Sequence, residues 1–414
     1  MKKILTVLFS MFLSIAAVSF LTACNDGDTP PLGPVVEIHT EDDLFAVANN
    51  LSGNYKLMND ITLTKNWRTV GTDAKPFAGA LDGGGHTLKN VTVQSDILSV
   101  DDTSIEYMVG LFGVLKGNIT NLKVDGFNIT VNSSVINQSD YASLKAANPS
   151  VTDFDIHVGL VGVNKGNIEK VTLTNVDFNV TPDTSTARVR MGGIAGKNND
   201  KIEDCAIFGA MDIINMDGYV RAGGVAGYVS SQGKVKDSNA NVTLSATMTG
   251  GAKMNLGGLV GNIECGTVQN CYSKGSITAT TTGSKATLAG GLIGTIDNSD
   301  TAKYEDMVVT VKNCLSSVGV TVNGNKGHAA GLIGRVEFNA AVNLTDNACS
   351  GAVNGINSYG FIGEIIYIGP SMDDNVTPEK LSDYASYLSI TGNKSVVADE
   401  FATQVAASEV VLPA

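Results

Sequence analysis

A short glycine-bounded tetrapeptide recurs along the chain and constrains the fold more than any other sequence feature. The pattern Gly-apolar-apolar-Gly begins at positions 110, 159, 193, 224, 258, 291, 331 and 360 of the 414 residues. The start-to-start spacings are 49, 34, 31, 34, 33, 40 and 29, so most repeats are a little over 30 residues long. Self-similarity at such a period is typical of architectures that stack one small unit on the next.

A second signature follows the tetrapeptide in successive repeats. An aliphatic residue stands two places before a polar residue, usually Asn or Asp, and a small or apolar residue comes next. The segments are 118–122 (NITNL), 167–171 (NIEKV), 201–205 (KIEDC), 234–238 (KVKDS) and 267–271 (TVQNC). The surrounding β-branched residues alternate with polar ones, which predicts short strands joined by turns.

These units predict an all-β, right-handed parallel β-helix of about eight repeats with short helical caps at both ends. Three short strands in about 30 residues cannot bury an apolar face alone, whereas stacking equivalent strands about 4.8 Å apart buries a continuous column. Two adjacent apolar residues break strict alternation, so we expect a bend or bulge at each tetrapeptide, where glycine permits special dihedrals or close approach. A β-propeller is the alternative, but its blades need four strands in about 40 to 50 residues and usually carry aromatic marks.

The repeats resemble the GLUG-motif family over residues 106–366. Upstream segments at 60–63 (DITL), 67–71 (WRTVG) and 77–88 (FAGALDGGGHTL) resemble the opening coil that precedes such arrays. Members of this family are bacterial exported and surface proteins, so the resemblance implies an exported repeat protein. It implies no particular activity, because the family is defined by its architecture.

The first 23 residues have the pattern of a bacterial lipoprotein signal peptide. Lys2 and Lys3 precede the apolar stretch 4–20, and Leu-Thr-Ala-Cys ends at Cys24. The box resembles that of lipoproteins, which implies cleavage before Cys24 and acylation of its thiol. A membrane-spanning anchor is the alternative, but the stretch is slightly short for a span. We expect this lipid to attach the protein to the outer membrane, with the folded part exposed on the cell surface.

The remaining chain divides into four expected segments. Residues 24–36 form a Pro-containing tether, 37–105 an N-terminal cap and opening coil, 106–370 the repeat array, and 371–414 a C-terminal cap. Thr40 followed by three acids predicts a capped helix at the N-terminal end. Thr377-Pro378 predicts a second helix that places three residues on one face, namely Leu381, Tyr384 and Leu388.

The net charge limits the possible partners, and the positions of the cysteines indicate their place in the fold. Acidic residues outnumber basic ones 41 to 28 and the net charge is −13, so we expect no nucleic-acid partner. Cys205, Cys271 and Cys314 occupy equivalent places after the Asp or Asn of their repeats, with Cys349 one place later. They predict a buried ladder of thiols, while disulfides, for which Cys265 adds a candidate, stay open.

Catalytic motifs are scarce in the sequence. None of the motifs of zinc hydrolases or serine hydrolases is present, and neither a metal nor a cofactor is expected. Because β-helices also host carbohydrate-active enzymes, two acidic groups are weighed as acid/base pairs, with solvated loop carboxylates as the favoured interpretation. They comprise Asp153 and Asp155 beside His157, and Asp297 and Asp300 near Glu305 and Asp306.

Two groups of residues are candidates for ligand binding. A column three places before the tetrapeptide contains Arg190, Arg221, Asn255 and His328, with Tyr107 and Asn357 in the outer coils. The insertion 132–157, with Tyr141 and Phe154, is predicted to be a variable loop, and loops on rigid scaffolds carry function.

The sequence therefore favours a non-catalytic, adhesin-like surface lipoprotein that binds an extended glycan or protein. A β-helical polysaccharide lyase or glycosidase, and a purely structural spacer or assembly subunit, are the alternatives. An aromatic-lined groove with paired carboxylates would favour the enzyme.

Overall fold

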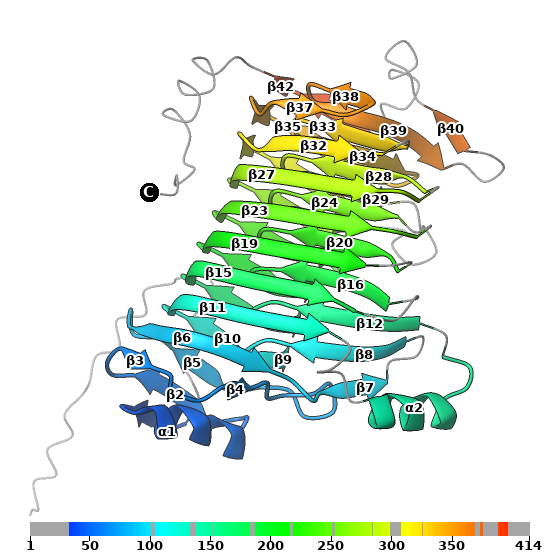
Figure 1. Ribbon diagram of the computed structural model, residues 1–414. Helices are drawn as coiled ribbons and strands as arrows, with labels where there is room; N and C mark the ends of the chain where they lie inside the picture. The colour runs from blue at the N-terminus through cyan, green and yellow to red at the C-terminus, as the bar shows by residue number, and fades with distance from the viewer. Residues whose placement is uncertain are drawn as a thin grey trace, which may run out of the picture.

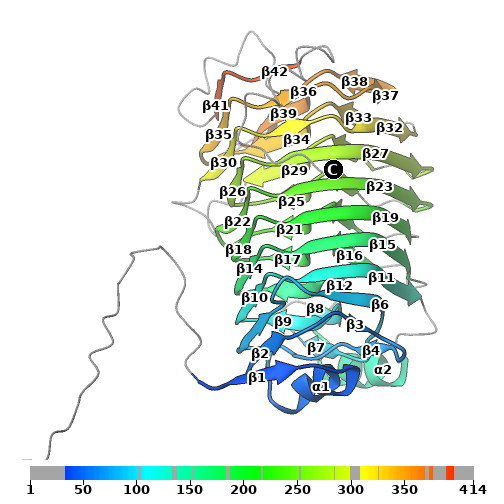
Figure 2. The same cartoon turned by 90° about the vertical axis from the view of Figure 1, so that its left-hand side faces the viewer.

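The structure is a computed structural model of the whole chain. It describes residues 33–100, 104–132, 138–151, 153–182, 187–215, 218–250, 253–283, 285–298, 308–324, 326–368, 373–375 and 388–395. Stacked coils form an elongated body, with the first coil at one end and the last at the other (Figures 1 and 2). The all-β, parallel β-helical fold predicted from the repeats is confirmed.

The described strands form four long sheets, here called A to D. Sheet D contains β7 (Leu98–Val100), β8 (Ser104–Val109), β12 (Asp153–Val158), β16 (Ala187–Gly192), β20 (Val220–Gly223), β24 (Met254–Gly257), β28 (Thr287–Gly290), β33 (Gly327–Ala330) and β38 (Asn357–Tyr359). Sheet C contains β9 (Phe112–Leu115), β13 (Val161–Asn164), β17 (Ala195–Asn198), β21 (Ala226–Val229), β25 (Val260–Ile263), β29 (Ile293–Asn298), β34 (Ile333–Phe338), β39 (Ile362–Ile368) and β40 (Asp373–Asn375).

Sheets A and B complete each coil. Sheet A contains β1 (Val35–Ile38), β2 (Asn54–Leu57), β5 (Ala80–Asp82), β10 (Asn118–Thr120), β14 (Asn167–Glu169), β18 (Lys201–Glu203), β22 (Gly233–Lys236), β26 (Gly266–Gln269), β30 (Val309–Lys312), β35 (Val342–Thr345) and β41 (Leu388–Thr391). Sheet B contains β3 (Ile61–Thr62), β4 (Trp67–Arg68), β6 (Thr87–Gln94), β11 (Lys123–Asn132), β15 (Thr172–Thr181), β19 (Ala206–Asn215), β23 (Asn239–Met248), β27 (Tyr272–Thr281), β31 (Leu315–Ser316), β32 (Gly319–Asn323), β36 (Ala348–Cys349), β37 (Val353–Asn354) and β42 (Lys394–Ser395).

A typical coil runs through β12, β13, β14 and β15, one strand in each sheet, before the next coil begins. Neighbouring coils pair in parallel, as between β12 and β16, whereas the described antiparallel pairs are β7 with β8 and β39 with β40. Parallel pairing between repeats rules out a propeller, whose blades are separate sheets of sequential strands. Four strands per coil correct the expected three.

The tetrapeptide marks the bend that produces the extra strand. Its two apolar residues, such as Leu259 and Val260, are fully buried, so the chain turns from sheet D into sheet C here, as expected from the broken alternation. The last glycine then packs against the preceding coil, because a Cβ on Gly261 would lie 2.5 Å from the amide nitrogen of Ala222. At this glycine, close approach rather than positive φ is the reason for the residue type.

The second signature forms the bend between sheets A and B. Its polar residue adopts the left-handed conformation, with φ of +52° at Asn121, +54° at Asn270 and +51° at Asn313. Asn and Asp tolerate this conformation better than other side-chain-bearing residues. The side chains also bond from coil to coil, since Asn313 Nδ2 donates to Asn270 Oδ1 at 2.9 Å and Asn270 Nδ2 donates to Asp237 Oδ1 at 2.9 Å.

The thiol column lies just after this bend, inside the core. Cys205, Cys271 and Cys314 are buried and free, with Ser238 at the equivalent place in the coil between the first two. Burial raises the pKa of the Cys205 thiol to about 12. The predicted buried ladder of thiols is confirmed, and the five described cysteines form no disulfide bond with one another.

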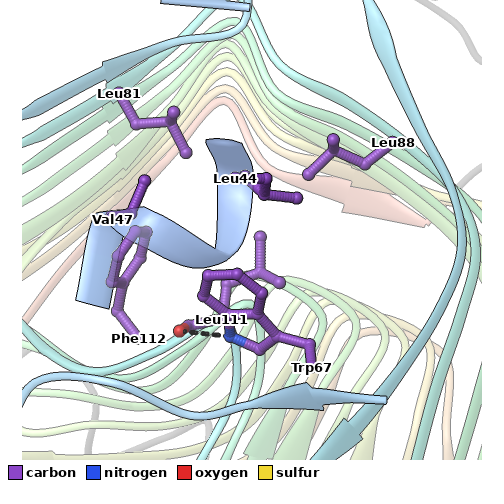
Figure 3. A pocket seen from close by; sticks show the side chains of 7 residues that line it. All are labelled: Leu44, Val47, Trp67, Leu81, Leu88, Leu111 and Phe112. Carbon is purple, nitrogen blue, oxygen red and sulfur yellow. Dashed lines mark hydrogen bonds between the residues drawn. The ribbon is translucent and has the colours of Figure 1, made fainter. Parts of the chain in front are cut away.

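A helix closes the N-terminal end of the core. The predicted N-cap is present, because Thr40 Oγ1 accepts a hydrogen bond from the amide of Asp43 at the start of α1 (Glu41–Phe45), which continues as the 3₁₀ helix η1 (Ala46–Asn49). Figure 3 shows Leu44 and Val47 entering the end of the core, above Trp67. The indole Nε1 of Trp67 donates to the carbonyl of Leu111 at 2.9 Å. The first strand, β1, begins at Val35, two residues inside the expected tether.

The C-terminal end differs from the expected helical cap where it is described. Leu388 begins β41, which pairs with β35 in sheet A, so this residue continues the coil instead of completing a helix face. Its β-branched neighbours in the stretch LSIT suit a strand. The expected helix around Thr377, Leu381 and Tyr384, and the tail after Ser395, lie outside the described residues. Among the described residues, no helix has the length and apolar character needed to cross a membrane.

Candidate functional site: a polar seam between sheets C and D

The bend at each tetrapeptide brings the outward side chains of sheets C and D against one another. We call these two facing columns the seam. The sheet D column is Met108, His157, Arg190, Arg221, Asn255, Leu288, His328 and Asn357. The sheet C column is Val114, Val163, Lys197, Tyr228, Asn262, Thr295, Arg335 and Glu364.

Contacts across the seam show that its side chains lie outside the main core. Met108, Val114 and Val163 form an apolar cluster of their own with Ile97. Farther along, Asn255 Nδ2 donates to Asn262 Oδ1 at 2.8 Å. The seam therefore changes from apolar in the first coil to charged and polar in the later ones.

The ligand column predicted from the sequence largely coincides with the seam. Arg190, Arg221, Asn255 and His328 share one column, with Leu288 between the last two. Tyr107 does not belong to it, because Tyr107 pairs with Ile156 and is only 1% exposed in the core. One residue fewer separates this strand from its tetrapeptide than in later repeats, so Met108 takes the place assigned to Tyr107.

A buried network of charges joins the first three coils of the seam, through strands β8, β12 and β16. Asp155 accepts from Arg188 Nε at 2.5 Å and Nη2 at 2.9 Å, and from Arg190 Nη1 at 2.6 Å. His157 Nε2 lies 3.2 Å from Glu106 Oε1 and 3.3 Å from Arg190 Nη1. Parallel register places these residues in neighbouring coils, since Asp155 pairs with both Glu106 and Arg188.

Burial and the arginines fix the charges of this network. Burial by itself raises the pKa of Asp155, but Arg190 and Arg188 more than offset it and hold the pKa well below its usual range. Burial also lowers the pKa of His157, as does the charge of Arg190. Near neutral pH, Asp155 is therefore ionised and His157 neutral.

The same network contains a set of groups with metal-ligand chemistry. One ligand atom from each of Glu106, Asp155 and His157 lies within 4.8 Å of the other two. However, the guanidinium of Arg190 lies against both Asp155 and His157, so a cation there would meet a buried positive charge. The donor set fits an arginine, not a metal ion.

Arginine and tyrosine side chains stack next along the seam. The Arg221 guanidinium lies 4.8 Å from the ring centre of Tyr219 and 4.3 Å from that of Tyr228. Arg190 lies 5.3 Å from the Tyr228 ring, and Asn255 Nδ2 donates to the Tyr219 hydroxyl at 2.9 Å. A pocket of about 110 Å³ opens beside this stack, and its lining comprises Arg188, Val189, Arg190, Tyr219 and Arg221.

The far end of the seam carries ion pairs. Arg335 lies 2.6 Å from Glu337 and 2.6 Å from Glu364, while His328 is 3.8 Å from Glu364. The His328 ring stacks on that of Tyr359, with centres 6.1 Å apart. Arg335 thus has two close carboxylate partners, in contrast to Arg221, whose guanidinium is 3.8 Å from Glu264.

The insertion predicted to be a variable loop is only partly a loop. Residues Gln138–Ala147 form α2, and the segment then enters β12. Phe154 is 1% exposed and belongs to the core, and the Tyr141 ring packs 4.8 Å from it. Both aromatic residues anchor the insertion, so the prediction of a ligand-binding loop built on Phe154 is wrong.

The interpretation of Asp155 as a solvated loop carboxylate is also wrong. Asp155 is 2% exposed and His157 fully buried, both on strand β12. Asp153 is half-exposed and pairs with Arg188 at 2.7 Å. In the second predicted group, Asp297 lies on β29, and the others lie outside the described residues, as does Cys24.

Two important residues of the site, one beside the seam and one within it, were not found from the sequence. Glu106 sits two places before Met108, which repeats the spacing of Asp155 and His157 and of Arg188 and Arg190 in the following coils. Alternation of charged and apolar residues in these three strands is the signal that identifies it. Tyr228 follows its tetrapeptide directly, and no repeated pattern marks it.

The fold and seam define the protein as a parallel β-helical repeat protein with charged side chains along one lateral bend. Residues 253–278 match the family described as "The GLUG motif". This match confirms the resemblance to the GLUG-motif family that the repeats indicate. No curated protein matches the sequence.

Two solved structures are similar to the chain. One is from Bacteroides ovatus and was described as a proposed immunoglobulin A1 protease, with 16% identity, a TM-score of 0.40, and coverage of 92% of this chain and 88% of that one. The other is an IgA1 protease with 15% identity and a TM-score of 0.40, of which this chain covers 25%. Both similarities are too distant to contribute to the functional argument.

Proposed function

We propose that the protein is a surface lipoprotein of the bacterial cell envelope that binds an extended ligand along the seam. The observation that carries this proposal is the arginine- and tyrosine-lined pocket in the middle of the seam. Stacked coils present side chains at a rise of about 4.8 Å, which suits a polymer contacted at several points. Many lipid-tethered copies would add avidity to a weak individual contact.

A carbohydrate-active enzyme is the second candidate, because Glu106 and Asp155 converge within 4.8 Å. Glycoside hydrolysis needs two carboxyl groups at about 5 to 10 Å, with one of them protonated as the acid. Asp155 is held ionised by two arginines, and Glu106 and Asp155 are 7% and 2% exposed. A substrate would have to displace the two arginines from Asp155, and His157 from Glu106, before reaching either carboxylate, which favours binding.

The proposal is tested by separating retention from turnover. The purified full-length chain, immobilised, is expected to retain glycans or matrix proteins from an array, and to release no oligosaccharides from a broad polysaccharide panel. Turnover that is lost in both Asp155→Asn and Glu106→Gln, under conditions where both variants remain folded, would establish the enzyme instead. Absence of retention on every surface tested would contradict the binding proposal.

A further inference from the structure

Three arginines line the seam pocket, and two of them have a carboxylate of the described residues within hydrogen-bond distance. Arg188, Arg190 and Arg221 all line it. Asp155 and Asp153 pair with Arg188, and Asp155 also pairs with Arg190. The Arg221 guanidinium is 3.8 Å from Glu264, beyond hydrogen-bond distance.

Two buried donors at this pocket have no acceptor within the described part of the chain. They are the Nε atoms of Arg190 and Arg221, whose side chains are 9% and 15% exposed. Leaving a buried N–H without an acceptor costs free energy, and this cost is larger for charged groups. Both guanidinium groups therefore keep hydrogen-bonding capacity that the described residues do not fill.

A row of basic residues extends the pocket along the outer edge of sheet D. The backbone bonds Val189 N to Tyr219 O and Val220 N to Lys253 O place Arg188, Tyr219 and Lys253 in line in successive coils. Two coils farther, Lys326 holds the same place, because Met254 N bonds to the carbonyl at 286 and Thr287 N to Lys326 O. Alternate coils are about 10 Å apart, so the positive charges recur at a regular interval.

We propose that the pocket binds the oxyanion group of an acidic polysaccharide, a carboxylate or a sulfate ester, as part of the ligand binding proposed above. The planar guanidinium forks of Arg190 and Arg221 suit such a group, which accepts several charge-assisted hydrogen bonds at once. The half-buried ring of Tyr219 forms one wall on which a sugar can pack. Regular spacing favours a repeating polymer over an acidic peptide, whose charges follow no fixed interval.

The local arrangement has to act against the overall charge of −13. A polyanion approaching this protein is repelled at long range, so affinity depends on the pocket instead of the general field. This dependence makes the proposal sensitive to single arginine substitutions.

The experiment measures binding of the full-length chain to immobilised polygalacturonate, dextran sulfate, neutral dextran and polyglutamate. Arg221→Gln is expected to weaken binding of the acidic polysaccharides about 10- to 100-fold, as for loss of a hydrogen bond to a charged group. Arg68→Gln is the matched control, because it removes the same charge from a side chain that is 68% exposed near the N-terminal cap, and its affinity should change less than twofold. Arg221→Lys should fall between the two, since it keeps the charge but loses the fork.

The four polymers distinguish the chemical groups that the pocket could bind, and the variants test whether the pocket is the binding site. Preference for polygalacturonate identifies a carboxylate, and preference for dextran sulfate a sulfate ester. If neutral dextran binds as well as both acidic polymers, the proposal of an oxyanion site is contradicted. The same holds if polyglutamate alone binds. Either result leaves the proposed ligand-binding function intact. Equal losses of affinity in Arg221→Gln and Arg68→Gln would contradict the assignment of binding to the pocket. If Arg221→Gln lowers thermal stability, Arg188→Gln, whose side chain is 30% exposed, provides the same comparison.

Discussion

Asp155 Oδ2 lies 2.6 Å from Nη1 of Arg190, a residue of the next coil. Both side chains are at least nine-tenths buried, and Arg190 continues along the seam to the Tyr228 ring. One carboxylate thus holds in place an arginine that also lines the pocket. Stability and ligand binding are coupled through this contact.

Removing the Asp155 charge should destabilise the protein strongly. In Asp155→Asn, Arg190 keeps a buried charge without its carboxylate, and breaking such a pair costs about 3 to 5 kcal/mol. Chemical denaturation of both variants measures the free energy of unfolding. Asp153→Asn is the control, because Asp153 pairs with the same Arg188 but is 39% exposed, so the loss should stay within about 1 kcal/mol. Equal losses in the two variants would contradict the buried role of Asp155.

Stability should fall as the pH drops from 7 to 5. The pKa of His157 is lowered in the folded state by burial, so below its unfolded pKa of about 6.5 the unfolded chain binds the extra proton. The lowered pKa of Asp155 adds a second loss below about pH 4, where unfolded Asp becomes protonated. Melting temperatures measured between pH 7 and about pH 3 check both losses. His157→Gln should reduce the loss of stability between pH 7 and 5 and leave the loss at lower pH unchanged. If the loss between pH 7 and 5 persists in this variant, another group causes it.

The last glycine of a tetrapeptide should not tolerate a methyl group. A Cβ at position 261 would meet the Gly227 carbonyl and the Ala222 amide at 2.5 Å, so Gly261→Ala should cost about 1 to 3 kcal/mol or more by overpacking. Gly319→Ala is a matched control, because the nearest heavy atom to its Cβ is 4.0 Å away. Thermal unfolding of the two variants distinguishes them, and similar melting temperatures would contradict the close-approach role.

The thiols of Cys205, Cys271 and Cys314 should resist modification in the native state. All three are fully or almost fully buried, and burial raises the pKa of Cys205 to about 12 and that of Cys271 above its usual value. Thiolate is the reactive form, so reagents should label these residues only after denaturation. Mass spectrometry of labelled peptides locates each modification. Rapid native labelling of all three would place the column in solvent.

The lipid anchor is testable independently of the fold. Acylation requires the thiol of Cys24, so Cys24→Ala should abolish incorporation of labelled fatty acid and leave the signal peptide uncleaved. Gel mobility and autoradiography of cells expressing each form report both effects. Incorporation equal to that of the unaltered chain would show that the lipid is attached elsewhere or that the label is unrelated.

The repeat pattern by itself determined the stacked architecture. Two apolar residues between glycines, and an Asn or Asp before a small residue, are local requirements of a bend and of a left-handed turn. Local requirements recur in every coil, so eight copies reinforce one another. The N-terminal helix was also predictable, because the Thr40 cap and its acids interact within one turn.

Register and the seam were decided only by the tertiary structure. A shift of one residue in the first repeats moves Tyr107 into the core and places Met108 in the seam, and side-chain direction alternates with every residue. Whether Asp155 is solvated depends on Arg188 and Arg190, which lie more than 30 residues away in sequence. Glu106 and Tyr228 likewise gain their environment from neighbouring coils. Bends and turns are encoded within a few residues, whereas burial and charge pairing arise from contacts between coils, which is why the scaffold could be read from the sequence and its site could not.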